Sequence, residues 1–213
     1  MTKQTDIARA VVEEAGTTLA AEAGIRMGDK PAALWQLLVL VNLVSARISA
    51  RIAMDAAHEL NRAGGTTPDG MARLSWQERV DALGRGHYVR YDESTATRLG
   101  QCAELAQEEC KGDLRRLAGD HERTRLMSGL QRFPGVGPTG AAIFCREVQA
   151  VWPWLRPFTD KLTRTGAERL GLPGEENDLG GLVEGDDMAA LAAGLTRVAR
   201  DGDLVTRIRD RAG

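Results

Sequence analysis

Residues 133–140 read Phe-Pro-Gly-Val-Gly-Pro-Thr-Gly, and this stretch decides the fold. Its first two glycines permit positive φ angles, the valine between them is an apolar plug, and the second proline suits a first helical turn. The pattern predicts two helices joined by a very tight turn. Such a turn leaves the backbone N–H groups of Gly135, Gly137 and Thr139 unpaired at the positive end of a helix, where one external anion can bind.

A DNA phosphodiester fits this amide cradle, because main-chain contacts position a DNA strand without reading its sequence. The stretch is also compatible with a plain turn in a helical bundle. In a third reading, the cradle holds the phosphate of a small molecule in a helical enzyme. We favour DNA and expect six residues to contact it: Phe133, Gly135, Val136, Gly137, Thr139 and Gly140.

Most of the remaining chain has the apolar spacing of helices, so the sequence predicts an all-α protein. Ser75 and Glu78 form a capping-box pattern at the start of a short helix. Residues 151–159 are rich in Trp and Pro and are expected to be extended, and 173–185 form a polar loop. The other predicted helices cover 6–23, 31–44, 45–62, 94–110, 114–117, 122–131, 138–150 and 160–171, with two short helices after 185.

The composition is that of an ordinary folded protein, with 43% hydrophobic and 27% charged residues in a chain of 213. The longest apolar run, 32–46, contains Gln36 and Asn42 and is shorter than the roughly 20 residues that span a bilayer. Residues 1–10 lack the apolar core of a signal peptide. We therefore expect a cytoplasmic monomer without a membrane anchor, associated with the nucleoid if the source is bacterial.

The cysteine and histidine content predicts no metal site built from side chains. The three cysteines lack CxxC spacing, which favours reduced thiols, and the three histidines are scattered.

The net charge of −2 is unusual for a nucleic-acid-binding protein, because such proteins generally use a basic surface. DNA binding would then require a local basic face. Its candidate residues are Arg47, Arg51, Arg132, Arg146, Arg156, Lys161 and Arg164.

Over residues 31–172 the sequence resembles the helix-hairpin-helix-GPD superfamily of base-excision DNA glycosylases, the endonuclease III-like enzymes. Three landmarks in the family's order carry the resemblance. They are the apolar helix that begins at Lys30-Pro31 and ends Leu43-Val44-Ser45-Ala46-Arg47, the hairpin 133–140, and Phe158-Thr159-Asp160 before a further helix.

The resemblance implies a two-lobe helical fold with a cleft between the lobes. A central barrel lobe would cover 31–150, with the helix-hairpin-helix at about 122–150. The second lobe would combine residues 1–30 with residues 151–213.

By the same resemblance, Asp160 is the catalytic carboxylate. Cleavage of an N-glycosidic bond develops positive charge on the sugar, which a carboxylate can stabilise while it or a neighbour activates water. Asp160 also fits a plain helix N-cap, and the two roles are compatible. Thr139 stands where bifunctional members carry a nucleophilic lysine, so we expect hydrolysis without AP-lyase activity. Lys161 is the alternative amine.

The resemblance also bears on cofactors. Many relatives hold an iron–sulfur cluster through four C-terminal cysteines, but no cysteine follows Cys145, so we expect no cluster. Family hairpins bind a monovalent cation through backbone carbonyls. We therefore expect sodium or potassium at residues 133–138.

Base removal requires the nucleotide to leave the stack, so a gap-filling side chain and a base pocket are expected. Arg47 lies where the family places the gap-filling residue, although a solvated surface arginine is an equal expectation. Candidate pocket residues are Trp35, His87, Tyr88, Trp152 and Trp154.

The sequence thus predicts a hydrolase of base-excision DNA repair that removes a damaged or mispaired base from double-stranded DNA. The alternative is a non-catalytic helix-hairpin-helix DNA-binding or scaffold protein derived from a glycosylase. The missing hairpin lysine, the missing cluster cysteines and the acidic net charge are consistent with that alternative.

Overall fold

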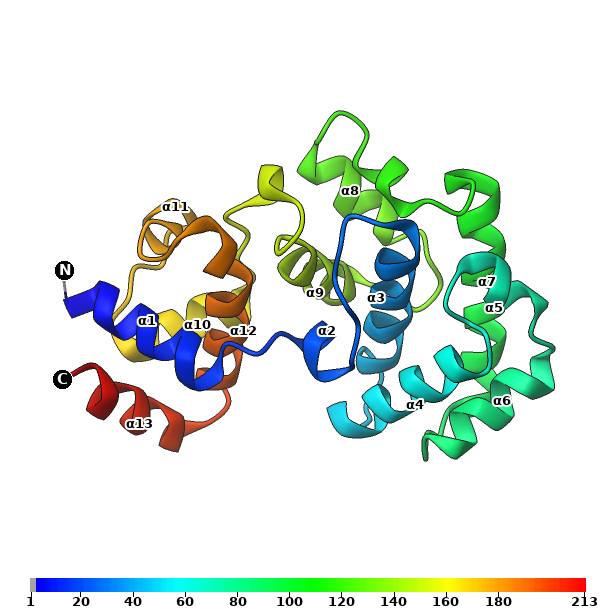
Figure 1. Ribbon diagram of the computed structural model, residues 1–213, viewed down its shortest axis with the longest axis horizontal. Helices are drawn as coiled ribbons and strands as arrows, with labels where there is room; N and C mark the ends of the chain where they lie inside the picture. Colours follow the sequence, from blue (N-terminus) through cyan, green and yellow to red (C-terminus); the bar gives the residue numbers. More distant parts are fainter. Residues whose placement is uncertain (1–2) are drawn as a thin grey trace. The chain divides into compact units, whose positions relative to one another are not determined.

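The computed structural model describes residues 3–213, and within them it contains helices and no β-strand. The predicted all-α class is therefore confirmed. The chain divides into two compact units, one of Ala20–Phe144 and one of Met1–Leu19 with Cys145–Gly213 (Figure 1). The sequence predicts boundaries at 30/31 and 150/151, whereas the units of the structure meet at 19/20 and 144/145.

The unit of residues 20–144 is built around one apolar helix, α3. Pro31 occupies its first turn, and every residue from Ala33 to Leu43 except Gln36 is buried. Helix α3 contacts α4 and η1, while α7 contacts α5, α6 and η1. The elements are α2 (Leu19–Glu22), α3 (Pro31–Val44), α4 (Ala50–Arg62), α5 (Pro68–Arg73), α6 (Trp76–Arg85), α7 (Asp92–Cys110), η1 (Leu114–Ala118), α8 (Arg123–Leu130) and part of α9 (Pro138–Val148).

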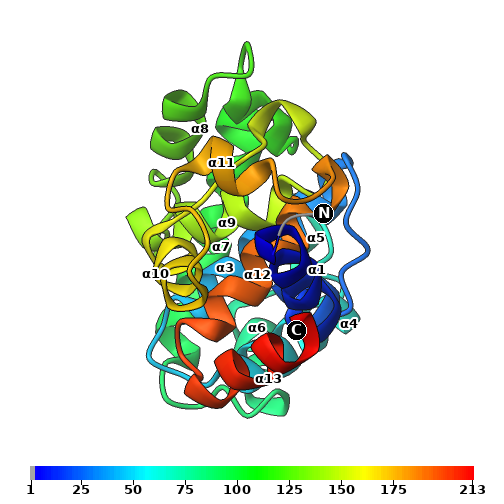
Figure 2. The same ribbon diagram turned by 90° about the vertical axis from the view of Figure 1, so that its left-hand side faces the viewer.

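The second unit joins the two ends of the described chain around α12. This helix contacts α1, α10 and α13, and Figures 1 and 2 show α1 beside α13. Close approach of α10 to α12 depends on Gly166, because a Cβ there would lie 1.9 Å from the Leu195 carbonyl oxygen. The elements are α1 (Lys3–Ala15), η2 (Pro153–Leu155), α10 (Lys161–Leu170), α11 (Glu176–Gly180), η3 (Gly185–Asp187), α12 (Met188–Val198) and α13 (Gly202–Ala212).

Local sequence signals set several helix ends. Ser75 and Glu78 form both reciprocal bonds of the predicted capping box. The single helix predicted over 6–23 is wrong, because the chain leaves helical geometry at 16–18. Glycine and the β-branched threonines in that segment have low helix propensity. The polar loop 173–185 also contains the short α11.

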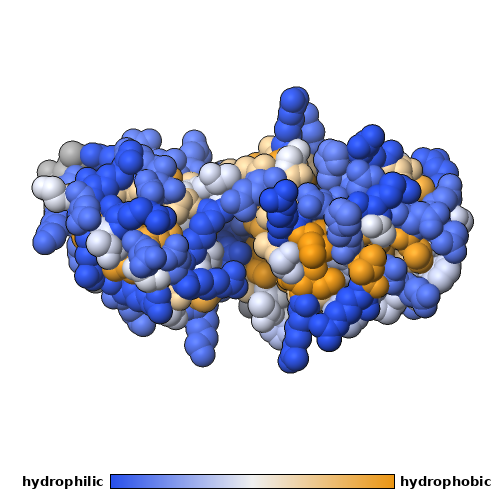
Figure 3. All heavy atoms as spheres, turned by 90° about the horizontal axis from the view of Figure 1, so that it is seen from below, coloured by the Kyte–Doolittle hydropathy of each residue, from blue (hydrophilic) through white to orange (hydrophobic). Residues whose placement is uncertain are grey.

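The surface seen in Figure 3 is covered mostly by hydrophilic side chains, with apolar atoms in smaller areas. Among residues 3–213, no helix is both long and apolar enough to cross a membrane.

Candidate functional site: the hairpin and the Asp160 segment

The hairpin between α8 and α9 has the predicted tight turn. The Val136 amide donates a hydrogen bond to the Phe133 carbonyl at 3.0 Å, and Gly135 adopts a φ of 84°. The side chains of Phe133 and Val136 are buried, with 2% and 3% of each residue exposed. Pro138 begins α9, as predicted. The apolar side chains thus anchor the turn, while Gly135 and Gly137 are exposed and Gly140 is buried.

The backbone amides of this turn are available to a ligand. Those of Gly135, Gly137 and Thr139 form no hydrogen bond within residues 3–213, and all three residues are exposed. The first backbone bond of α9 joins the Ala141 amide to the Gly137 carbonyl at 2.9 Å. Gly137, unlike Gly135, does not adopt a positive φ. Unpaired amides at a helix N-terminus favour an anion through both hydrogen bonding and the helix dipole.

A buried asparagine supports the turn from the protein side, which sequence reasoning missed. Asn42 of α3 is 2% exposed, and its Nδ2 donates to the Pro134 carbonyl at 2.6 Å. The Cys102 thiol donates to the same oxygen at 3.4 Å. A Cβ on Gly135 would lie 2.7 Å from Asn42 Nδ2. The only sequence signal was that Asn42 interrupts an apolar run.

Three carbonyl groups at the predicted cation site accept hydrogen bonds within the protein. Phe133 accepts from Val136, Pro134 accepts from Asn42, and Gly137 accepts from Ala141. A carbonyl oxygen has two lone pairs, so these bonds leave acceptor capacity. Binding of sodium or potassium to the hairpin stays a prediction.

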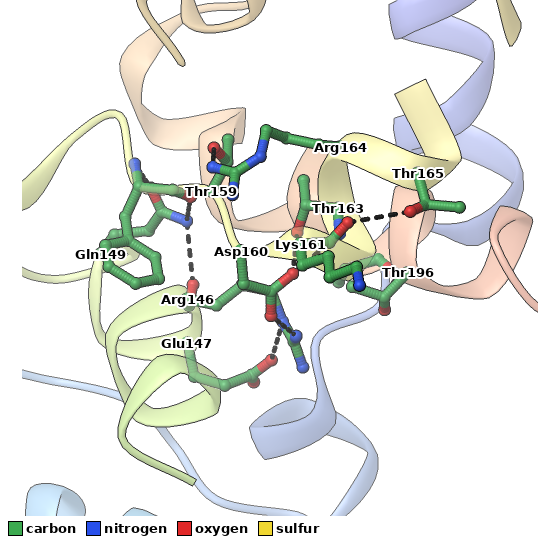
Figure 4. A network of polar contacts seen from close by, with 12 residues as sticks. Arg146, Glu147, Gln149, Thr159, Asp160, Lys161, Thr163, Arg164, Thr165 and Thr196 are labelled. Atoms are coloured by element: carbon green, nitrogen blue, oxygen red, sulfur yellow. Dashed lines mark hydrogen bonds and ion pairs between the residues drawn. The ribbon is translucent and has the colours of Figure 1, made fainter. Parts of the chain in front are cut away.

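Asp160 caps α10 and forms an ion pair with Arg146 of α9 (Figure 4). Its Oδ1 accepts bonds from the Thr163 amide at 2.8 Å and the Thr163 hydroxyl at 2.9 Å. Its Oδ2 accepts a bond from Arg146 Nη1 at 2.6 Å. Burial alone would raise the pKa of the Asp160 carboxyl, but the Arg146 charge and the Thr163 bonds outweigh it. The pKa is therefore lowered, and the carboxylate is ionised at neutral pH.

The chain just before Asp160 is fixed by two side chains. Gln149, directly after the end of α9, is fully buried, donates to the Phe158 carbonyl at 3.1 Å and accepts from the Phe158 amide at 2.9 Å. Glu176 of α11 accepts from the Thr159 amide at 2.8 Å. These bonds pair backbone groups of an extended segment that has no strand neighbour. The position of Asp160 is therefore set from both sides of the segment.

Four of the arginines expected on a local basic face bind groups of the protein itself, and the basic face stays a prediction. Arg146 is buried against Asp160. Arg156 donates to the Gln149 and Ala150 carbonyls and pairs with Asp186. Arg132 and Arg51 form ion pairs with Glu109 and Asp55, respectively.

Three other candidate residues are on the surface. Thr139 is exposed in the first turn of α9, and Arg47 is exposed in the loop between α3 and α4. Lys161 is also exposed, and Figure 4 shows its side chain extending away from the Asp160 carboxylate. Their roles stay predictions.

The candidate base-pocket residues occupy different environments. Trp35 is fully buried and donates to the Gly65 carbonyl at 3.0 Å, and Tyr88 is fully buried with its hydroxyl 3.5 Å from the Leu43 carbonyl. His87 is exposed. The rings of Trp152 and Trp154 stack with centroids 5.4 Å apart. These contacts are those of packed side chains, and a base-pocket role stays a prediction.

The three cysteines are buried, and none is in a disulfide bond. Burial raises the pKa of Cys102 to about 12 and that of Cys110 to about 11, so both stay protonated at neutral pH. Among residues 3–213, no group of three or more Cys, His, Asp or Glu side chains is arranged to hold a metal ion.

No protein-family model matches the chain, and no curated protein matches its sequence. Solved structures that resemble its fold include two endonuclease III–DNA complexes. One is a trapped covalent endonuclease III–DNA intermediate described as an estranged-adenine complex, with a TM-score of 0.51. The other is a non-covalent endonuclease III–DNA complex, with a TM-score of 0.52. Each is 16% identical and matches over 92% of this chain and 85% of its own. The protein therefore has an endonuclease III-like helical fold.

Proposed function

We propose that this protein is a DNA glycosylase that hydrolyses the N-glycosidic bond of a damaged or mispaired base in duplex DNA. The observation that carries the proposal is Asp160, an ionised and largely buried carboxylate at the head of α10 in an endonuclease III-like fold. The sequence resemblance assigns the catalytic acid to the same residue. The activity would belong to base-excision DNA repair.

The hairpin would hold the DNA backbone. The unpaired amides of Gly135, Gly137 and Thr139 can donate to phosphate oxygens, and the N-terminus of α9 adds a favourable dipole. Contacts of this kind need few basic side chains. They are therefore compatible with a net charge of −2.

Asp160 would act on the sugar of an extruded nucleotide. As the base departs, positive charge develops on the sugar ring, and an ionised carboxylate stabilises that charge. Water then adds to the sugar carbon from which the base has left, and the released base takes up a proton. Thr139 offers no amine at the start of α9, so the proposed reaction is hydrolysis without strand cleavage.

A second candidate is a DNA-binding protein without catalytic activity. The observation in its favour is that both oxygens of Asp160 already accept hydrogen bonds, from Thr163 and from Arg146. Capping of α10 together with the Arg146 ion pair would explain Asp160 without a catalytic role. This candidate shares the hairpin contact with DNA and differs only in the chemistry.

A screen of lesion-bearing duplexes separates the two candidates. Each duplex is incubated with wild type, with Asp160→Asn, and with Asp210→Asn as an exposed matched control, and then treated with alkali to reveal sites that have lost a base. A glycosylase gives alkali-labile sites with wild type and Asp210→Asn, and far fewer with Asp160→Asn. If wild type binds the duplexes but releases no base from any of them, the proposal is wrong and the binding protein is favoured.

A further inference from the structure

Arg146 lies between two carboxylates in the second unit. Its Nη1 donates to Asp160 Oδ2 at 2.6 Å, and its Nε lies 3.9 Å from Glu147 Oε1. The side chains of Arg146, Asp160 and Glu147 are 9%, 14% and 1% exposed. An arginine so deeply buried loses most of its hydration, which costs free energy. The hydrogen bond to Asp160 and the nearby Glu147 charge offset that cost.

Arg146 in the last turn of α9 and Gln149 in the turn directly after it bind the same segment. Gln149 binds both backbone groups of Phe158, and Arg146 binds the carboxylate two residues further on. One side chain thus fixes the backbone before Asp160, and the other fixes the orientation of the acid itself. Figure 4 shows this arrangement.

From this geometry we infer that Arg146 is a positioning residue that holds Asp160 ionised and aimed for base release. The inference rests on the proposed function. Arginine suits the task because its guanidinium stays charged at every physiological pH and donates in fixed directions. The Thr163 bonds alone would orient Oδ1 but would leave Oδ2 without a donor, so that burial would favour the protonated acid.

Few other charges face the Asp160 segment. Glu147 lies on α9 beside Arg146, and Glu176 of α11 binds Thr159. On α10 itself, Arg164 lies 3.5 Å from the Thr159 hydroxyl, and Lys161 extends away from the carboxylate. Among the charged side chains named here, only Arg146 contacts the Asp160 carboxylate. Its removal should therefore change the titration of Asp160 most.

The test combines a titration with a pH–rate profile. The Asp160 carboxyl is followed by ¹³C NMR in wild type, Arg146→Gln, Arg146→Lys and the control Arg207→Gln, which removes an exposed charge paired with Glu14. In Arg146→Gln the Asp160 pKa should rise, because burial is no longer opposed by the arginine charge. Arg146→Lys should keep it low, and Arg207→Gln should leave it unchanged.

The pH–rate profile then tests whether base release requires the ionised form of Asp160. With Arg146→Gln, base release should fall about tenfold for each pH unit below the raised pKa, while Arg146→Lys should restore activity at low pH. An equal loss at all pH values would show a merely structural role and overturn the inference, as would an unchanged Asp160 titration. If Arg146→Gln does not fold, the Arg146→Lys and wild-type titrations decide: a wild-type Asp160 pKa at or above its ordinary value contradicts the inference.

The two measurements fail independently. The NMR titration needs no substrate, so it tests Arg146 even if no duplex is cleaved. Absence of base release by wild type contradicts the proposed function and leaves the titration result standing.

Discussion

The polar groups of the hairpin and of the Asp160 segment differ in whether the protein itself supplies their hydrogen-bond partners. At the hairpin, three exposed amides have no partner within residues 3–213. Around Asp160, the carboxylate accepts three hydrogen bonds and the preceding backbone is paired as well. A site that binds a ligand by its backbone can leave donors open to water. A buried charge requires partners of its own before any substrate arrives.

Removing the charge of Asp160 should separate the roles of the two regions most clearly. We expect Asp160→Asn to slow base release by at least about 100-fold, because the developing positive charge on the sugar loses its counter-charge. Affinity for duplex DNA should stay near that of wild type, since the hairpin amides are unchanged. Single-turnover rates and fluorescence anisotropy measure the two quantities. A parallel loss of binding and rate would show that the two regions do not have separate roles.

The hairpin can be tested with two glycines that differ in conformation. Gly135→Ala should destabilise the protein by about 1–2 kcal/mol, because an alanine at φ 84° is strained and its Cβ meets Asn42. Gly137→Ala has no positive φ and nothing within 4 Å of its added Cβ, so a change below about 0.5 kcal/mol is expected. Urea unfolding measures both. Equal effects would contradict the hairpin geometry.

The contribution of Asp160 to the free energy of unfolding should depend on pH. Because the folded-state pKa of Asp160 is lowered, its ionisation stabilises the protein fully above the unfolded-state pKa of about 3.9. That stabilisation is lost as the pH falls through the folded-state pKa. The difference in free energy of unfolding between wild type and Asp160→Asn should therefore shrink from pH 5 downward. A difference that stays constant to low pH would contradict the lowered pKa.

The smallest expected effect is the absence of a covalent protein–DNA intermediate. With Thr139 at the start of α9, wild type should form no adduct with a lesion-bearing duplex on borohydride reduction. Gel electrophoresis under denaturing conditions detects such an adduct. If one forms, the hydrolytic mechanism is wrong, and its loss in Lys161→Ala would identify the amine.

Local signals predicted much of the framework. The glycines and proline of 133–140 predicted the turn and the start of α9, and Asp160 with Gly171 marked both ends of α10. Each of these signals acts within a few residues of the chain. The structure bears out the positions but leaves the functional roles as proposals.

The side chains that support the two regions were not predicted from the sequence. Asn42, Arg146 and Gln149 bind groups far away in the chain or on another element. Arginine and glutamine are most often exposed, so the sequence pattern assigns them to the surface by default. Only the packing of α3 under the hairpin, and of α9 against the 158–160 segment, shows what these side chains bind.

The most direct test of the amide cradle is an NMR titration of the hairpin with duplex DNA. Gly24 is a matched control for Gly135, because both are exposed with a positive φ, but the Gly24 amide is already bonded to the Ala21 carbonyl at 3.0 Å. We predict large changes in the ¹H–¹⁵N shifts of Gly135 and Gly137 at saturating DNA, with Gly24 unmoved. If DNA binds while the Gly135 and Gly137 amide shifts stay unchanged, the hairpin amides do not hold the DNA backbone.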